Sequence, residues 1–258
     1  MEEKNYRVLR IEEQLYGCEE LPEGQPVLCD VLLEAADGTQ RVLPYPDAEL
    51  TRLDINEGST VTLQDHRLTK AAHKVYFPRH GETVWNVENK ICGATDIELT
   101  ALGHEQAIET GKKILEKKIE ADVILYSPLV RAKDTALHIS EITGIPAKEE
   151  MRLKEQNFGK YESTARDGAK FREAKKQFVE RYEGGESMLQ LAQRVYNLLD
   201  EVKASGKTCI LVAHNGIARV VQSYFYEMTN EEYAAFGVDN CAILQYEFPG
   251  EENGGAKA

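Results

Sequence analysis

The sequence predicts an α/β protein: a mostly parallel sheet flanked by helices on both faces, preceded by a small all-β domain. Three observations support this prediction. The texture of the chain changes near residue 70, short β-type runs with turn signals precede that point, and strand-like and helix-like segments alternate after it. We expect a small domain over residues 1–70, a larger one over 71–250, and a disordered tail over 251–258, where Gly and Glu are frequent.

Residues 1–70 are predicted to form a small, mostly antiparallel β-barrel or sheet. The strand candidates are Tyr6–Ile11, Val27–Glu34, Arg41–Leu43 and Val61–Leu63. Asp37-Gly38 separates the second candidate from the third, and this dipeptide is typical of a hairpin turn. No segment of this part shows a convincing helical pattern.

The rest of the chain alternates strands and helices, as parallel sheets require. The predicted strands are Lys74–Pro78, Ala121–Tyr126, Thr208–Ala213 and Asn240–Phe248. Three helices are predicted to begin at Thr100, at Ser127-Pro128 and at Ser187. The first has Ile108, Gly111, Ile114 and Leu115 at helical spacing, and the third has an apolar face of Leu189, Ala192, Val195, Leu198 and Leu199.

Composition narrows the class of partner. The net charge of −13 argues against nucleic acid or an anionic membrane surface, whereas a local basic pocket could still bind a small anion. Five scattered cysteines fit a reducing compartment and no disulfide framework. The first residues lack the features of a signal peptide, and no apolar run is long enough to cross a bilayer. We therefore expect a cytoplasmic protein, with no metal cluster and no cofactor.

Three predicted strands end in candidate functional residues. His80 follows the strand at 74–78, His214 follows the strand at 208–213, and Arg131 lies in the first helical turn after the strand at 121–126. In open α/β sheets, ligands bind beyond the carboxyl ends of the strands. We expect these three side chains to meet at one edge of the sheet.

Their chemistry fits the transfer of a phosphoryl group, which needs fixed donors around its oxygens and an in-line nucleophile. Arg79 and Arg131 are the candidate donors, because a guanidinium can hold two phosphate oxygens. His80 is the candidate nucleophile, and His214 would stabilise charge from the opposite side. Glu155 is the candidate general acid, kept protonated by a neighbouring dianionic substrate and later able to activate water. This mechanism requires no metal.

At these residues the sequence resembles the histidine phosphatase superfamily, the phosphoglycerate-mutase-like clan. The matching stretches lie in family order within residues 75–246: Arg79–Asn86, Gly93–Thr100, Ser127–Ala132, Thr135-Ala136, Glu155–Gly159, Gly184–Ser187 and Val212–Gly216. The resemblance implies a phosphohistidine on His80, in a phosphate pocket lined by Arg79, Arg131 and His214. It also implies that Asn86 binds phosphate and that the backbone of Cys92 and Gly93 meets the rest of the substrate.

One position departs from the family pattern. Many members have glycine directly after the distal histidine, where this chain has Asn215. A side chain there would narrow the pocket or add a hydrogen bond to the substrate. Asn215 is therefore expected to influence substrate choice and not the chemistry.

The resemblance covers both phosphatases and phosphoglycerate-type mutases. Mutases carry a longer insertion between the acid and the distal histidine, with an arginine pair that holds a second acid group. Only 58 residues separate Glu155 from His214 here, and residues 156–213 contain no adjacent arginine pair. The preferred hypothesis is a phosphatase for small phosphorylated metabolites, with a mutase as the alternative.

Two segments allow a further interpretation. Residues 1–70 are expected to be either a binding module for a protein partner or a packing element that stabilises the larger domain or a homodimer. If they are a binding module, the larger domain could also act as a reader of phosphorylated ligands. The stretch Arg166–Arg181 has six basic and three acidic residues, which suits either a lid that steers substrate or a solvated helix face. The solvated face is the favoured interpretation.

Overall fold

The computed structural model describes residues 4–14, 25–35 and 37–248, which form two compact units. The first unit contains the described residues up to Lys74 together with 201–207 and 247–248, and the second contains 75–200 and 208–246. The predicted tail over 251–258 lies outside the described residues. Within them, no helix combines the length and the apolar character needed to span a membrane.

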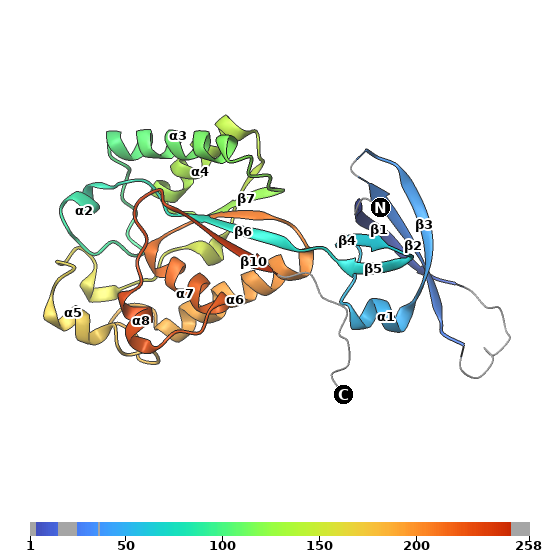
Figure 1. Ribbon diagram of the computed structural model, residues 1–258. Coiled ribbons are helices and arrows are strands. Elements are labelled where there is room, and N and C mark those ends of the chain that lie inside the picture. The colour runs from blue at the N-terminus through green and yellow to red at the C-terminus, as the bar shows by residue number, and fades with distance from the viewer. Residues whose placement is uncertain (1–3, 15–24, 36, 249–258) are drawn as a thin grey trace. The chain divides into compact units, whose positions relative to one another are not determined.

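The first unit is built on a five-stranded sheet (Figure 1). Its strands are β1 (Lys4–Glu13), β2 (Leu28–Ala35), β3 (Gln40–Pro46), β4 (Thr60–Gln64) and β5 (Arg67–Lys70), in the order β3-β2-β1-β4-β5. Neighbours pair antiparallel, and β2 and β3 form the predicted hairpin. The Tyr45 hydroxyl accepts a hydrogen bond from the Leu68 amide at 3.2 Å, so it links the two edge strands of a curled sheet.

The prediction of an all-β first part is wrong in one respect. A short helix, α1 (Asp47–Arg52), follows β3 and buries Leu50 in the core of this unit. Polar residues close together in the sequence favour this helix: acidic residues occupy its first turn, and Arg52 pairs with Glu49 at 2.8 Å in its last turn. A helix with only one buried apolar residue has no apolar periodicity to detect.

The second unit contains the sheet that carries the candidate site. Its strands are β6 (His73–Pro78), β7 (Val123–Tyr126), β8 (Ala147–Glu149), β9 (Cys209–Val212) and β10 (Ile243–Phe248), in the order β10-β6-β9-β7-β8. The pairs β6–β9, β9–β7 and β7–β8 are parallel. Every residue of the central strand β9 is buried, as expected where helices cover both faces.

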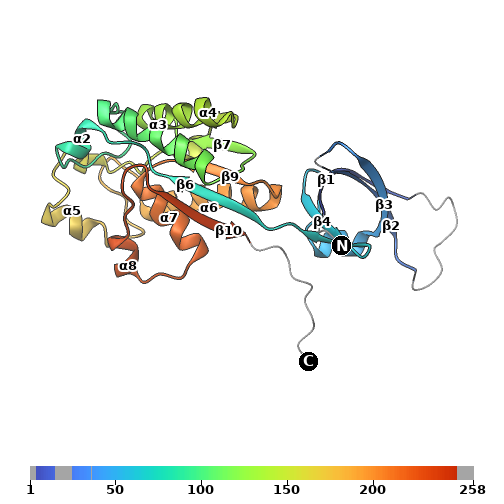
Figure 2. The same ribbon diagram turned by 45° about the horizontal axis from the view of Figure 1, so that its top comes forward.

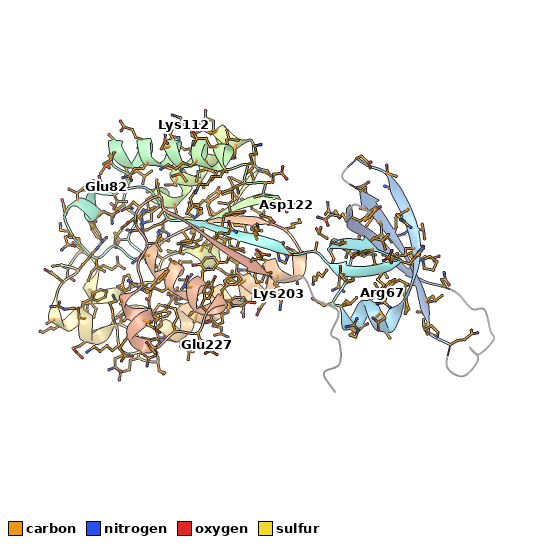
Figure 3. All side chains as sticks on the ribbon, in the orientation of Figure 1. Arg67, Glu82, Lys112, Asp122, Lys203 and Glu227 are labelled. Carbon is orange, nitrogen blue, oxygen red and sulfur yellow. The ribbon has the colours of Figure 1, made fainter. Side chains whose placement is uncertain are left out.

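Four long helices flank this sheet: α3 (Ala101–Glu116), α4 (Val130–Thr143), α6 (Met188–Ser205) and α7 (Asn215–Phe225). Figures 1 and 2 show α3 and α4 on one face and α6 and α7 on the other. Charged side chains such as Lys112 and Glu227 project from the outer surfaces of this unit (Figure 3). The shorter elements are α2 (Val84–Val87), α5 (Ala169–Ala174), α8 (Asn230–Ala235) and the 3₁₀ turns Met151–Leu153 and Gly159–Tyr161.

The helix starts were predicted with mixed success. Thr100 caps α3 as predicted, because its side chain accepts a hydrogen bond from the Gly103 amide at 3.0 Å. Helix α4 begins only at Val130, so the prediction that Ser127-Pro128 opens it is wrong. In α6, Val195, Leu198 and Leu199 are buried as predicted, whereas Leu189 is 60% exposed.

Two glycines allow the loop after β6 to lie against the start of α3. A Cβ atom on Gly103 would lie 2.2 Å from the Glu82 carbonyl oxygen, and one on Gly81 would lie 2.3 Å from the Gly103 carbonyl oxygen. Real Cβ atoms do not approach backbone so closely, hence no larger side chain fits without backbone movement. The close approach fixes the segment that contains His80.

We predict that Gly103→Ala lowers the free energy of unfolding of the second unit by about 1–3 kcal/mol, because the added methyl group pushes the Glu82 backbone away. Urea unfolding followed by tryptophan fluorescence would measure it, since Trp85, the single tryptophan, lies in this unit. Leu102→Ala is the control, because Leu102 is 49% exposed on the same helix turn. Equal stability of the two variants would contradict the packing argument.

Candidate active site

The pairing of β6 with β9 brings two histidines together. Arg79 forms a parallel bridge with Ala213, and the His80 amide donates to the Ala213 carbonyl at 3.0 Å. The residues that follow, His80 and His214, place their rings 5.1 Å apart between centroids, at 57°. The structure therefore places both predicted histidines at one edge of the sheet.

His80 is held in the tautomer that a nucleophile needs. Its Nδ1 lies 2.7 Å from the Gly81 carbonyl oxygen. A carbonyl only accepts, so Nδ1 carries the proton and Nε2 keeps its lone pair. Burial holds the pKa of His80 well below its usual range, and the charges of Arg131 and Arg79 add to this effect. The imidazole is therefore neutral at neutral pH.

His214 is wholly buried at the N-terminus of α7. Its Nε2 lies 2.7 Å from the Ser127 hydroxyl, and its Nδ1 has no hydrogen-bond partner among the described residues. Burial, followed by the charge of Arg131, lowers its pKa. Ser127, which the sequence suggested as a helix cap, instead orients this ring.

The two arginines occupy different surroundings. Arg79 donates from Nη1 to the Val238 carbonyl, and burial lowers its pKa to about 10. Arg131 is wholly buried and donates to the carbonyls of Thr95 at 2.9 Å and Gly93 at 2.7 Å. The Nε atom of each has no partner among the described residues. Arg131 thus fixes the 93–95 loop while its charge acts on both histidines.

Glu155 lies in the same pocket as His80. Its carboxylate accepts backbone hydrogen bonds from Gln156 at 2.8 Å and from Gly216 at 2.9 Å. Burial raises its pKa, and the two amides only oppose that shift. A Cβ atom on residue 216 would lie 2.4 Å from the nearer carboxylate oxygen, so a larger residue there would displace the Glu155 carboxylate from this position.

The pocket brings most of the predicted residues to a single surface. Of those residues, Arg79, His80, Asn86, Cys92, Glu155 and Asn215 line it. Arg131 and His214 are fully buried and do not belong to the lining. Gly93 is not in the lining either: its amide donates to Glu162 at 3.0 Å.

Two lining residues also have structural contacts. Asn86 closes the capping box of α2, and its Oδ1 accepts from the Thr83 amide at 3.0 Å. The Oδ1 of Asn215 accepts from the Val238 amide at 2.8 Å, and Val238 is also the residue whose carbonyl holds Arg79. Asn215 therefore contributes to the loop that positions Arg79.

Sequence reasoning missed several residues of the pocket. Arg166, Lys175 and Arg219 line it, so the interpretation of 166–181 as a solvated helix face is wrong for Arg166 and Lys175. Glu162 was missed as well. Its carboxylate accepts from the amides of Gly93, Ala94, Thr95 and Phe158 and from the Thr95 hydroxyl. The positive excess of 166–181 in an acidic chain was the available signal for the two cations.

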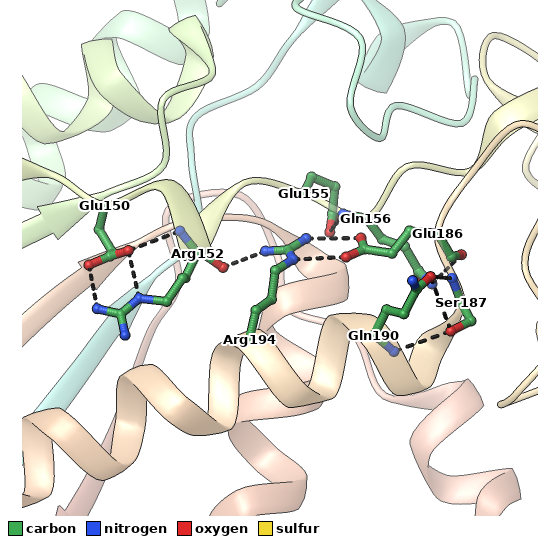
Figure 4. Close-up of polar contacts among 8 residues, drawn as sticks. All are labelled: Glu150, Arg152, Glu155, Gln156, Glu186, Ser187, Gln190 and Arg194. Atoms are coloured by element: carbon green, nitrogen blue, oxygen red, sulfur yellow. Dashed lines mark hydrogen bonds and ion pairs between the residues drawn. The ribbon is translucent and has the colours of Figure 1, made fainter.

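A polar network supports the segment that contains Glu155 (Figure 4). Arg194 on α6 makes a two-pronged ion pair with Glu186, at 2.9 and 3.0 Å, and also donates to the Arg152 carbonyl. The Glu186 backbone in turn pairs with Asn157 and accepts from the Gln156 side chain at 3.4 Å. Arg194 thus ties the segments on both sides of Glu155 to one helix.

The arrangement can bind and attack an anionic centre. It combines a neutral imidazole with a free Nε2, a second imidazole, two guanidinium groups and a buried carboxyl. Within the described ranges, no group of three or more His, Cys, Asp or Glu side chains is arranged to hold a metal ion. Such a combination of groups is suited to the transfer of a phosphoryl group through histidine.

Comparison with known proteins identifies the family. The model of the histidine phosphatase superfamily (branch 1) matches residues 75–255, and the chain belongs to this superfamily. It is 32% identical over 169 residues to the 2,3-bisphosphoglycerate-dependent phosphoglycerate mutase of Chelativorans sp. (strain BNC1), which covers 60% of this chain and 82% of that protein.

Other relatives carry phosphatase names. The chain is 37% identical over 139 residues to a Bacillus subtilis (strain 168) protein named "Uncharacterized phosphatase PhoE", covering 53% of this chain and 68% of that one. Among solved structures, mycobacterial glucosyl-3-phosphoglycerate phosphatase superimposes with a TM-score of 0.61 at 27% identity, over 69% of this chain and 91% of that chain. The protein is therefore an enzyme of this superfamily with both phosphatase and mutase relatives.

We predict that Arg194→Met lowers kcat at least about threefold for alkyl phosphates and less for p-nitrophenyl phosphate. The substitution loosens the segment around Glu155, and a poor leaving group depends more on proton donation. Arg194→Lys should restore part of the loss, and Arg172→Met, at an exposed position, is the matched control. An equal loss for both substrates would show that Arg194 does not act through Glu155.

Proposed function

We propose that the chain is a metal-independent phosphomonoester phosphatase that works through a phosphohistidine on His80 and acts on small phosphorylated metabolites. The observation that carries this proposal is the state of His80: its Nδ1 proton is bound to the Gly81 carbonyl, and its surroundings keep the ring neutral. An imidazole with a free Nε2 beside two arginines is prepared to attack phosphorus.

In the first step the lone pair of His80 Nε2 attacks phosphorus, and the bond from phosphorus to the ester oxygen breaks. Glu155 donates its proton to the departing oxygen, so the alcohol leaves neutral. Arg79, Arg131 and His214 surround the phosphoryl oxygens and stabilise their charge. The Nε atoms of both arginines are donors without a partner among the described residues, and the buried Nδ1 of His214 has none either. In the tautomer whose Nε2 accepts from the Ser127 hydroxyl, that Nδ1 is also a donor.

In the second step a water molecule attacks the phosphohistidine. The Glu155 carboxylate accepts a proton from the water, the phosphorus–nitrogen bond breaks, and its electron pair returns to His80 Nε2. Inorganic phosphate leaves, and Glu155 is protonated again. The cycle closes without a metal or an external acid.

A mutase is the alternative, because several relatives carry that name. A mutase must keep its phosphohistidine until a substrate alcohol accepts the phosphoryl group. The short connection between Glu155 and His214, with no adjacent arginine pair in residues 156–213, favours the phosphatase. Product analysis separates the two: a phosphatase releases phosphate, and a mutase interconverts phosphate positions.

We predict that His80→Ala lowers kcat for p-nitrophenyl phosphate by about 10³-fold or more, because the nucleophile is lost. The wild-type enzyme should keep its activity in EDTA and should incorporate acid-labile phosphate in a rapid-quench experiment. His66→Ala is the control, since His66 is exposed and belongs to the first unit. Substantial activity in His80→Ala would refute the proposed mechanism.

We predict a bell-shaped pH dependence of kcat/KM, whose two limbs are set by the pKa values of His80 and Glu155. His80 must be neutral, so activity is present above its lowered pKa and is lost as pH falls through it. Glu155 must be protonated in the first step, so activity is present below its raised pKa and is lost as pH rises through it.

Glu155→Gln should remove the alkaline limb and lower kcat by about 10²–10⁴-fold for alkyl phosphates. Both enzymes are measured with the same substrate, so that ionisation of the substrate cancels. An alkaline limb that persists in Glu155→Gln would assign the proton to another group.

A further inference from the structure

Four cationic side chains line the pocket, and the reaction proposed above uses only one of these four. Arg79 belongs to the phosphate site. The other three are Arg166, Lys175 and Arg219. Arg166 lies in the loop before α5, Lys175 directly follows α5, and Arg219 lies in the middle of α7. Glu155 is the one acidic side chain in this lining, and burial favours its neutral form.

These three cations have no ionic partner within the described residues, although the chain as a whole carries an excess of acidic residues. Each is held by one backbone carbonyl. Arg166 Nε donates to Lys90 at 2.8 Å, Lys175 Nζ to Ala234 at 3.3 Å, and Arg219 Nε to Phe236 at 2.8 Å. The terminal nitrogens of both guanidinium groups form no hydrogen bond to any described residue, so they remain available to a ligand.

The segment that carries Arg166 and Lys175 is fixed in place. Ile91 accepts a backbone hydrogen bond from Ser163 at 2.9 Å and donates one to Thr164 at 2.8 Å, and Lys90 forms a bridge with Ala165. Phe171 packs into an apolar cluster with Ile91, Phe158 and Tyr182, and Lys175 lies 5.7 Å from the Phe171 ring centroid. The cations are therefore arranged before any ligand binds.

Holding these charges together costs free energy in the empty pocket. Burial lowers the pKa of Lys175 to about 8, and the charge of Arg219 adds to this effect. Burial and the charge of Arg166 lower the pKa of Arg79 to about 10. A dianionic phosphate would balance two of the four lining charges and leave two without a counterion. A second phosphate on the substrate would balance both of these charges, and a carboxylate would balance one of them.

We propose that Arg166, Lys175 and Arg219 form a second anion subsite, which selects phosphomonoesters whose leaving group carries a carboxylate or a second phosphate. This inference rests on the proposed function, because it describes the leaving-group side of the same pocket. The aromatic residues Phe158 and Phe171 also line this pocket and limit the space beside the charges. Uncharged leaving groups would leave the cations desolvated and unpaired, so their transition states are bound less tightly.

The experiment compares substrates that differ in the second group alone. The first pair is 3-phosphoglycerate and glycerol 3-phosphate, and the second is glucose 1,6-bisphosphate and glucose 6-phosphate. The ratio of kcat/KM within each pair is measured for the wild type, Lys175→Gln, Arg219→Gln and Lys176→Gln. Lys176 is the matched control, since it neighbours Lys175 but is exposed and paired with Glu173. Thermal unfolding checks each variant, and Lys175→Gln carries the test if the partly buried Arg219 cannot be replaced.

We expect the wild type to prefer the charged member of at least one pair by about tenfold or more, which corresponds to about 1.4 kcal/mol. Lys175→Gln and Arg219→Gln should reduce that ratio at least fivefold, whereas Lys176→Gln should retain it. The pair with the larger preference identifies the group as carboxylate or phosphate. Hydrolysis without preference, or a preference unchanged in both variants, overturns the subsite and leaves the phosphatase intact. Failure of the wild type to hydrolyse any phosphomonoester overturns the proposed function and this inference with it.

Discussion

The parallel pairing of β6 with β9 is the constraint on which the site depends. The hydrogen bond from the His80 amide to the Ala213 carbonyl extends this pairing beyond the strands, so the two histidines leave the sheet side by side. Gly81 and Gly103 then allow the loop after His80 to lie against α3. The Thr135 hydroxyl on α4 accepts a hydrogen bond from the Gly81 amide at 3.1 Å. Because each contact restrains backbone, the imidazole is positioned before a substrate arrives.

Burial acts on the two reacting groups in opposite directions. It lowers the pKa of His80 and raises the pKa of Glu155, so that both are favoured in their neutral forms. These are the forms needed to attack phosphorus and to protonate the leaving oxygen. A single physical effect, the removal of water, thereby prepares the proposed nucleophile and the proposed acid together. The cationic guanidinium groups reinforce it at His80, since a second positive charge there would be repelled.

The sequence was most informative where chain order determines position. Strand ends of a parallel sheet share an edge, so the convergence of His80 and His214 could be predicted from the apolar runs that precede them. The contributions of Glu162, Arg166 and Arg219 could not, because they depend on how loops pack against each other. Glu162 accepts hydrogen bonds from backbone amides of the 93–95 loop. Since every residue except proline has such an amide, the residue types of the loop do not reveal this contact. The late start of α4 was missed for a related reason: the Ser127 hydroxyl bonds to His214, a distant partner.

The net negative charge of the chain and the cations of the pocket act on an anionic ligand over different distances. An acidic chain repels phosphorylated molecules at long range, but that repulsion between exposed charges is screened over about a Debye length in physiological salt. Inside the pocket the screening is weaker and the cations have no internal counterions among the described residues. Binding of the proposed anionic substrate would therefore be determined by the few charges that reach the pocket, not by the overall excess of acid. The cations strain the empty pocket, because burial and mutual repulsion oppose their charge, and an anionic ligand relieves both. In the proposed second anion subsite, an anion that spans the phosphate site and Arg219 would relieve more of this strain than phosphate alone, so the same charges that destabilise the free enzyme would favour the bound state.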